Sequence, residues 1–230
     1  MKRIALALVA ALAVTAFALE SFELKRTEAA GRVQKYTVAM DFDAESMSGD
    51  FSATVTTTVE SVDGAGVAKV KHEMADGLVN VSGQQMARDL PTYTATVGGD
   101  NAVRKVEGEN VTPTILRFVR AINPVFPTGP SEVKDGIASW TVDVAADGEQ
   151  GTPAWKGTGK FVGKEVQSGE ECLKLEYDLA EGEGDLPIKS KGTAWVRPTD
   201  GTMVKLSFDV QNLPVEGFVM NAKYNVTLVK

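Results

Sequence analysis

The sequence predicts an all-β protein, built as a curved antiparallel sheet or as a two-sheet sandwich or half-barrel, with about ten to eleven strands and one short helix. The first observation is alternation: Leu173, Leu175 and Tyr177 are separated by charged residues, which is the period of a strand with one buried face. The second is that turn-forming pairs such as Asp200-Gly201 separate these segments. The third is that helical spacing is confined to residues 112–122.

The alternating segments fall into two groups along the chain. In the first half, strands are expected near residues 36–42, 51–59, 70–74, 78–83, 92–97 and 102–107. In the second half, they are expected near 137–145, 156–166, 171–181, 188–197, 202–211 and 218–229. The many Val and Thr residues in these segments favour strands, because β-branched side chains pack well on a pleated surface.

The helical segment lies between the two groups. Thr112 followed by Pro113 is typical of a helix N-terminus, because Thr caps the first free N–H groups and Pro suits the first helical position. The apolar residues that follow have a helical period: Ile115, Leu116, Val119 and Ile122. Asn123-Pro124 ends the helix, and the prolines beyond it predict a stiff, irregular linker.

The two groups of strands resemble each other in the order of their motifs. Tyr36-Thr37-Val38 recurs as Trp140-Thr141-Val142, and residues 94–97 resemble 193–196. The predicted organisation is a signal peptide at 1–18, an N-terminal β-meander at 19–111, a helix and proline linker at 112–136, and a C-terminal β-meander at 137–230. Because any two strands share alternation, chance similarity is the alternative to an internal repeat. The pattern also leaves open whether the halves form one sheet or two domains.

The first eighteen residues have the features of an export signal. Met1-Lys2-Arg3 gives a positive start, an uncharged apolar run extends from Ile4 to Ala18, and the run ends in a small-x-small pattern. The run is too short to cross a hydrocarbon layer of about 30 Å comfortably, so we expect a cleaved signal, with an uncleaved anchor as the alternative. The product is then exported, periplasmic or extracellular, with no membrane span after cleavage.

Composition excludes several classes of protein. With 24 Lys and Arg against 31 Asp and Glu, the net charge is −7, which disfavours nucleic acid as a partner. One cysteine and one histidine cannot form an internal disulfide or a Cys/His zinc cluster, and no cofactor or metal is expected. Cys172 is expected to be a buried, inert thiol, with an intermolecular disulfide as the alternative.

No catalytic constellation stands out, so we expect that the protein is not an enzyme. His72 alternates with Val70 and Met74 and is expected to be a structural or partly buried histidine. A Gly-x-Ser-x-Gly nucleophile motif is absent from the sequence. Asp41 and Asp43 belong to an acidic stretch that lacks the EF-hand spacing, so a solvated acidic face is expected there rather than a calcium site.

The centre of the chain resembles a known family. Phe126-Pro127, Gly136 and Trp140 are similar to the Phe-Pro…Gly…Trp linker of an uncharacterised family of secreted bacterial all-β proteins. The hairpin from Gly192 to Leu206 is also similar to that family. More distantly, the succession of strands and turns resembles the periplasmic lipoprotein-carrier fold, a curved antiparallel sheet that cups an apolar ligand. That resemblance implies hydrophobic cargo.

Together these observations predict a non-enzymatic exported envelope protein whose sheet forms a cup for an apolar ligand. Its partner would be an apolar small molecule or an envelope protein. The candidate lining residues on the apolar face of the sheet are Trp140, Trp195, Phe208 and Leu175. Large aromatic rings usually belong to the core, so the alternative is a structural or protein-interaction module with a filled core, without a ligand and without a cavity above about 300 Å³.

Overall fold

The computed structural model describes residues 21–45, 47–88, 91–109, 111–182, 184, 186–215 and 218–230. The predicted signal peptide, residues 1–18, lies outside the described residues. The described residues form fourteen strands and one helix: β1 (Ser21–Phe22), β2 (Val33–Ala44), β3 (Met47–Val62), β4 (Ala68–Val81), β5 (Gln84–Ala87), β6 (Tyr93–Val97), β7 (Val103–Glu107), α1 (Pro113–Ile122), β8 (Ser131–Lys134), β9 (Ile137–Val144), β10 (Trp155–Gln167), β11 (Glu170–Glu181), β12 (Lys189–Val196), β13 (Met203–Val215) and β14 (Phe218–Leu228).

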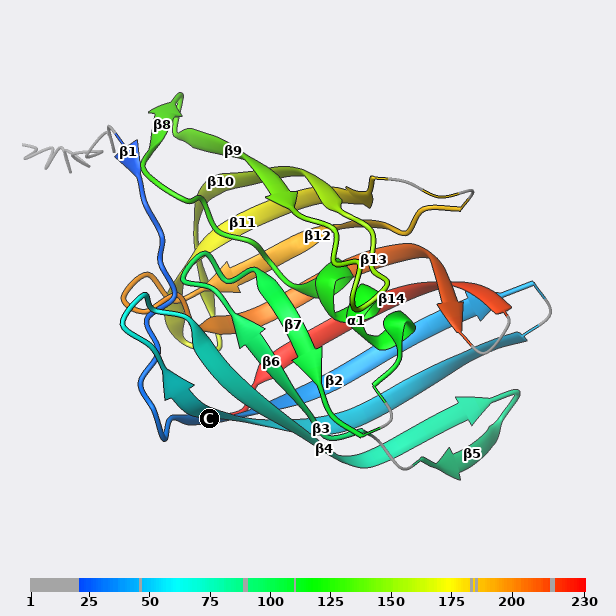
Figure 1. The fold of residues 1–230 in the computed structure, drawn as a ribbon. Coiled ribbons are helices and arrows are strands. Elements are labelled where there is room, and N and C mark those ends of the chain that lie inside the picture. The colour runs from blue at the N-terminus through cyan, green and yellow to red at the C-terminus, as the bar shows by residue number, and fades with distance from the viewer. Residues whose placement is uncertain are drawn as a thin grey trace, which may run out of the picture.

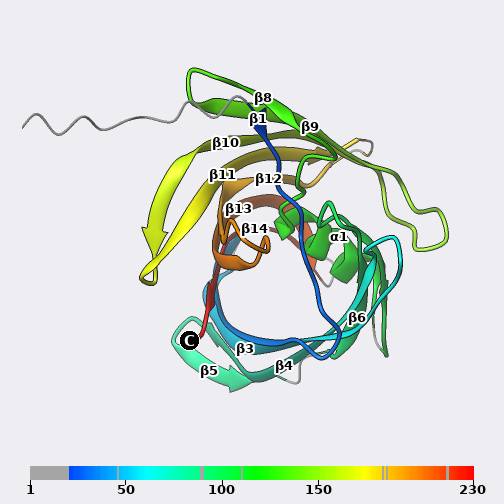
Figure 2. The ribbon, with the colours of Figure 1, turned by 90° about the vertical axis from the view of Figure 1, so that its left-hand side faces the viewer.

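All of these strands belong to one antiparallel sheet, in the order β1-β8-β9-β10-β11-β12-β13-β14-β2-β3-β4-β6-β7, with β5 paired to β4. The sheet curls around its concave face without closing, as the end-on view in Figure 2 shows. The predicted curved antiparallel sheet with one short helix is therefore confirmed, and the two-sheet sandwich is not adopted.

The expected number of strands, about ten to eleven by alternation, is too low. The additional strands β1, β5 and β8 have two, four and four residues, which is too short to show an alternating pattern. The expected strand at 78–83 is instead the second half of β4, which continues from Ala68 to Val81 through a register shift against β3.

The two groups of strands form one continuous sheet because the last strand pairs with the first long one. In this β14–β2 pair, Val226 lies opposite Val38 and Tyr224 opposite Met40. Each group is a meander in which neighbouring strands are close in sequence, β2-β3-β4-β6-β7 and β8-β9-β10-β11-β12-β13-β14. The boundaries proposed for the two halves and their internal repeat remain predictions.

The core lies on the concave face of the sheet, as the alternation predicts. Leu175 and Phe208 are 0% and 1% exposed, and Tyr177 stacks on Phe208 with ring centroids 5.9 Å apart. Cys172 is also fully buried on β11, where burial raises the pKa of its thiol. The expectation of a buried cysteine is confirmed.

Helix α1 packs inside the curve of the sheet, against β7, β12 and β13 (Figure 1). It begins as predicted, because the Thr112 side chain accepts a hydrogen bond of 3.3 Å from the Ile115 amide and Pro113 occupies the first turn. Its apolar side buries Leu116, while Asn123 ends it. Within the described part of the chain, no helix is long and apolar enough to cross a membrane.

Residues 23–32, called here the N-terminal strap, cross the open end of the curved sheet (Figure 2). Ahead of the strap, Phe22 stacks on Phe161 with ring centroids 4.8 Å apart. The strap then donates backbone hydrogen bonds from Thr27 to the Asp200 carbonyl at 3.0 Å and from Gly31 to the Val59 carbonyl at 2.8 Å. The strap thus links the β12–β13 turn to β3 across the open end of the curved sheet.

Candidate binding site

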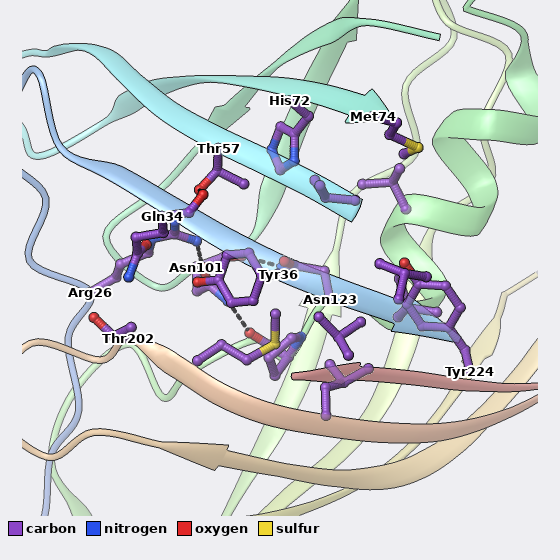
Figure 3. A pocket seen from close by; sticks show the side chains of 18 of the residues that line it. Arg26, Gln34, Tyr36, Thr57, His72, Met74, Asn101, Asn123, Thr202 and Tyr224 are labelled. Atoms are coloured by element: carbon purple, nitrogen blue, oxygen red, sulfur yellow. Dashed lines mark hydrogen bonds between the residues drawn. The ribbon is translucent and has the colours of Figure 1, made fainter. Parts of the chain in front are cut away.

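A cavity of about 110 Å³ opens to solvent on the concave face of the sheet. Its walls come from β2, β3, β4 and β6 on one side, β13 and β14 on the other, and α1 at one end. Arg26 of the N-terminal strap closes the opposite end (Figure 3). The cavity therefore exists because a sheet with one apolar face is only partly covered by a single short helix and a strap.

His72 forms part of the cavity wall together with Tyr93, its neighbour across the β4–β6 pair. The two rings are stacked, with centroids 4.7 Å apart and planes inclined by 11°. Burial, reinforced by the positive charge of Arg26, lowers the pKa of His72 to about 3. The imidazole is therefore neutral at physiological pH and acts in the wall as a flat, weakly polar surface.

Three tyrosines share the concave face around the cavity: Tyr36, Tyr93 and Tyr224. Burial raises the pKa of Tyr36 to about 12 and raises the pKa of Tyr93 and Tyr224 further above the usual range. Their phenol groups therefore remain protonated, so the rings supply apolar surface with an occasional hydrogen-bonding group.

At the strap end, Arg26 is held in place by Asn101 of the β6–β7 loop and by Glu28 of the strap itself. Its Nη1 donates to Asn101 Oδ1 at 2.5 Å and its Nε donates to the Glu28 carboxylate. Asn101 in turn donates from Nδ2 to the Pro124 carbonyl at 2.7 Å, and Asn123 donates to the Asn101 carbonyl. Asn101 is 4% exposed, so this end of the cavity is a built polar network and not a loose surface loop.

The ionisable side chains among the described lining residues are Arg26, His72 and three tyrosines. Among the described residues that line it, His72 is the titratable group closest to neutral pH, and no lining side chain is acidic or a thiol. The described residues contain no group of three or more His, Cys, Asp or Glu side chains placed to hold a metal ion. The acidic Asp41 and Asp43 lie exposed on β2, away from the cavity lining.

The four lining residues expected from the sequence lie elsewhere. Trp140, Phe208 and Leu175 are buried in the main core, 8%, 1% and 0% exposed, and the Trp140 indole donates to the Val125 carbonyl at 2.9 Å. Trp195 lies on the outer face of the sheet. None of the four is among the residues that line this cavity, and a role for them in binding stays a prediction.

Trp195 points outward because its neighbours point inward. Ala194 and Val196 are both 0% exposed, and alternation along the strand then places the residue between them on the opposite face. Its ring is flanked by the ammonium groups of Lys205, 5.0 Å from the ring centroid, and of Lys174, 5.9 Å away. The expectation that Trp195 belongs to the core is wrong.

Sequence reasoning missed most of the residues that line the cavity. The alternation of His72 with Val70 and Met74 was a usable signal for one of them. Arg26 and Asn101 lie in segments without periodicity, and they meet across 75 positions of the chain. They meet because the strap crosses the open end of the curved sheet and passes the loop between β6 and β7.

No family model matches the chain, and no curated protein matches its sequence. Two solved structures are similar to it in part. A protein with a YmcC-like fold from Bacteroides fragilis shares 11% identity at a TM-score of 0.31, covering 91% of this chain and all of its own. A DUF1329 family protein from Desulfovibrio piger shares 11% identity at a TM-score of 0.24, covering 87% of this chain and 85% of its own. At these scores neither likeness bears on ligand or activity.

Proposed function

We propose that the protein is an exported, non-enzymatic binding protein whose concave cavity takes up a small apolar molecule. The observation that carries this proposal is the solvent-open cavity of about 110 Å³ between the sheet and α1. Export is supported by the residue pattern of the first eighteen positions. The lining offers ring faces and aliphatic groups with few charges, which is typical of ligand pockets.

The volume limits the size of the ligand. An engineered apolar cavity of about 150 Å³ holds benzene, so this smaller cavity of about 110 Å³ encloses at most a single aromatic ring. A larger molecule would extend through the opening into solvent. An entire lipid acyl chain does not fit unless the strap moves.

The same volume supports the alternative, a structural or protein-interaction module without a ligand. Ligand pockets usually have at least about 300 Å³, whereas this cavity has about 110 Å³. The two proposals differ in one measurable respect, which is the specific occupation of the cavity by a small probe.

Ligand-observed NMR with benzyl alcohol tests the proposal directly. Benzyl alcohol has eight heavy atoms, and a binding free energy of about −0.5 kcal/mol for each gives about −4 kcal/mol in total. We therefore expect a Kd near 1 mM. Met74→Trp should abolish binding because Met74 lines the cavity. Met40→Trp is the matched control, since Met40 is a half-buried methionine of the same concave face outside the lining.

A second arm tests larger cargo. Native mass spectrometry of protein purified from its own host, together with titration of a fluorescent fatty acid, would detect a bound lipid. If benzyl alcohol still binds the Met74→Trp variant, the cavity is not its binding site and the proposal is wrong. If neither a lipid nor a small probe binds at all, the alternative of a module with a filled core is favoured.

A further inference from the structure

The cavity has two chemically different ends. Figure 3 shows polar side chains gathered at the strap end: Arg26, Gln34, Thr57, Asn101 and Thr202. At the other end, Met74 and Tyr224 lie beside α1, which contributes Val119 and Ile122. A ligand that fills this space must therefore be apolar at one end and polar at the other.

The polar end carries a positive charge. Arg26 is the cationic residue among the described residues that line the cavity, and none of them is acidic. A guanidinium group has five N–H donors, and the contacts to Glu28 and Asn101 use Nε and Nη1. Among the described residues, Arg26 makes no hydrogen bond through Nη2, so these donors remain available to a ligand acceptor.

The guanidinium is also fixed before any ligand arrives. The Arg26 amide donates to the Gly99 carbonyl at 3.1 Å, and Nη1 of the guanidinium donates to the Asn101 side chain. Glu28 lies beside Arg26 with its side chain 4% exposed, at 3.6 Å from Arg32. Glu28 pairs with Arg26 at Nε and is not among the residues that line the cavity. Groups held in place in this way bind with a smaller loss of conformational entropy.

The charge at this end suits one negative charge rather than two. The neighbours of Arg26 in the lining are neutral: the amide of Gln34, the hydroxyl of Thr57 and the imidazole of His72. A phosphate group carries about −1.5 to −2 at neutral pH and would meet one arginine only. A carboxylate carries a single charge and matches the planar fork of a guanidinium.

We propose that the ligand is a small monocarboxylate, with its acid group against Arg26 and its apolar body directed toward Met74 and α1. This inference rests on the proposed binding function and adds the chemical class of the ligand. It concerns binding alone and involves no chemical step.

The test compares benzoate with benzamide, which have the same shape and differ in charge. By ligand-observed NMR or calorimetry at pH 7.5, benzoate should bind the wild-type protein at least tenfold more tightly. Arg26→Gln should remove this preference, whereas Arg26→Lys should keep part of it. Lys25→Gln is the matched control, because Lys25 lies on the same strap, pairs with Glu23 and is not among the residues that line the cavity.

The outcomes separate the inference from the proposed function. Equal affinity for benzoate and benzamide in the wild-type protein, or a preference that persists in Arg26→Gln, overturns the carboxylate inference and leaves the apolar binding site standing. Failure of both probes and of benzyl alcohol to bind overturns both. The wild-type comparison needs no variant, so it decides even if Arg26→Gln folds poorly.

Discussion

The imidazole of His72 lies parallel to the phenol of Tyr93, with ring centroids 4.7 Å apart and planes inclined by 11°. The pair faces Arg26, the cation whose charge adds to burial in disfavouring a protonated imidazole. A protonated His72 would lie near the positive charge of Arg26, and none of the described residues that line the cavity is acidic. The folded state therefore favours the neutral form of His72.

This requirement predicts a loss of stability in mild acid. The pKa of His72 is about 3 in the folded state and about 6.5 in an unfolded chain, so the unfolded state binds more protons between these values. The contribution of His72 to the free energy of unfolding is fully present above about pH 6.5. Between about pH 6.5 and pH 3 it falls by about 1.4 kcal/mol for each unit by which the pH decreases. Urea unfolding should show a loss of about 2 kcal/mol between pH 7 and pH 5.

The variant His72→Phe provides the control, because it keeps a flat ring against Tyr93 and cannot be protonated. His72 is the single histidine of the chain, and most carboxyl groups titrate below pH 5. The variant should therefore have nearly constant stability between pH 7 and pH 5. An equally steep loss in His72→Phe would contradict the assignment of this pH dependence to His72.

Gly159 provides a second prediction, because it leaves room for the Trp140 indole on the neighbouring strand. The two residues face each other in the β9–β10 pair, and a Cβ atom on Gly159 would lie 2.3 Å from Trp140 Cε2. Gly159→Ala should then displace the ring, weaken its hydrogen bond to Val125 and cost about 2 kcal/mol. The measurement is thermal unfolding, with Gly129→Ala as the control, since a Cβ there meets nothing within 4 Å.

Local structure could be predicted well from the sequence, both for the buried faces of the strands and for the start of the helix. The period of two placed Leu175 and Phe208 on a buried face, and the Thr112-Pro113 pair located the start of α1. These features depend on neighbours in the chain, and they repeat over several residues. The short strands β1 and β8 lack that repetition, which is why they were not predicted.

The candidate site was much less predictable, because its residues come together only through the curvature of the sheet and the path of the strap. Arg26 meets Asn101, and Arg32 meets Asp200 across 168 positions. Neither arginine lies in a periodic segment. Trp195 was mispredicted for a different reason. Its aromatic ring suggested a buried residue, but Ala194 and Val196 on either side point into the core, so Trp195 lies on the outer face of the sheet.

The ion pair between Arg117 of α1 and Glu181 at the end of β11 gives a third prediction. The pair is bidentate, with distances of 2.6 Å and 2.5 Å, and the Glu181 side chain is 0% exposed. Arg117→Ala should destabilise the protein by about 3 kcal/mol, because it leaves a buried carboxylate without its partner. Urea unfolding measures the effect.

The double variant Arg117→Ala with Glu181→Gln tests the reason for that loss. Glutamine keeps an oxygen for the Ile188 amide, which donates to Glu181 at 2.9 Å, and carries no charge. The double variant should regain most of the stability lost in Arg117→Ala. If it is as unstable as the single variant, the loss comes from missing packing on α1 and not from the unpaired charge.

A final prediction concerns Trp195 and decides where on the sheet a ligand binds. Its ring lies on the outer face near Lys205 and donates to Glu165 at 2.5 Å. Such exposed contacts contribute little, so Trp195→Ala should cost no more than about 1 kcal/mol, whereas Phe208→Ala in the core should cost about 3 to 5 kcal/mol. Benzyl alcohol should bind Trp195→Ala as it binds the wild-type protein, because the cavity lies on the other face. Loss of probe binding in this well-folded variant would instead place the ligand on the outer face of the sheet, against Trp195.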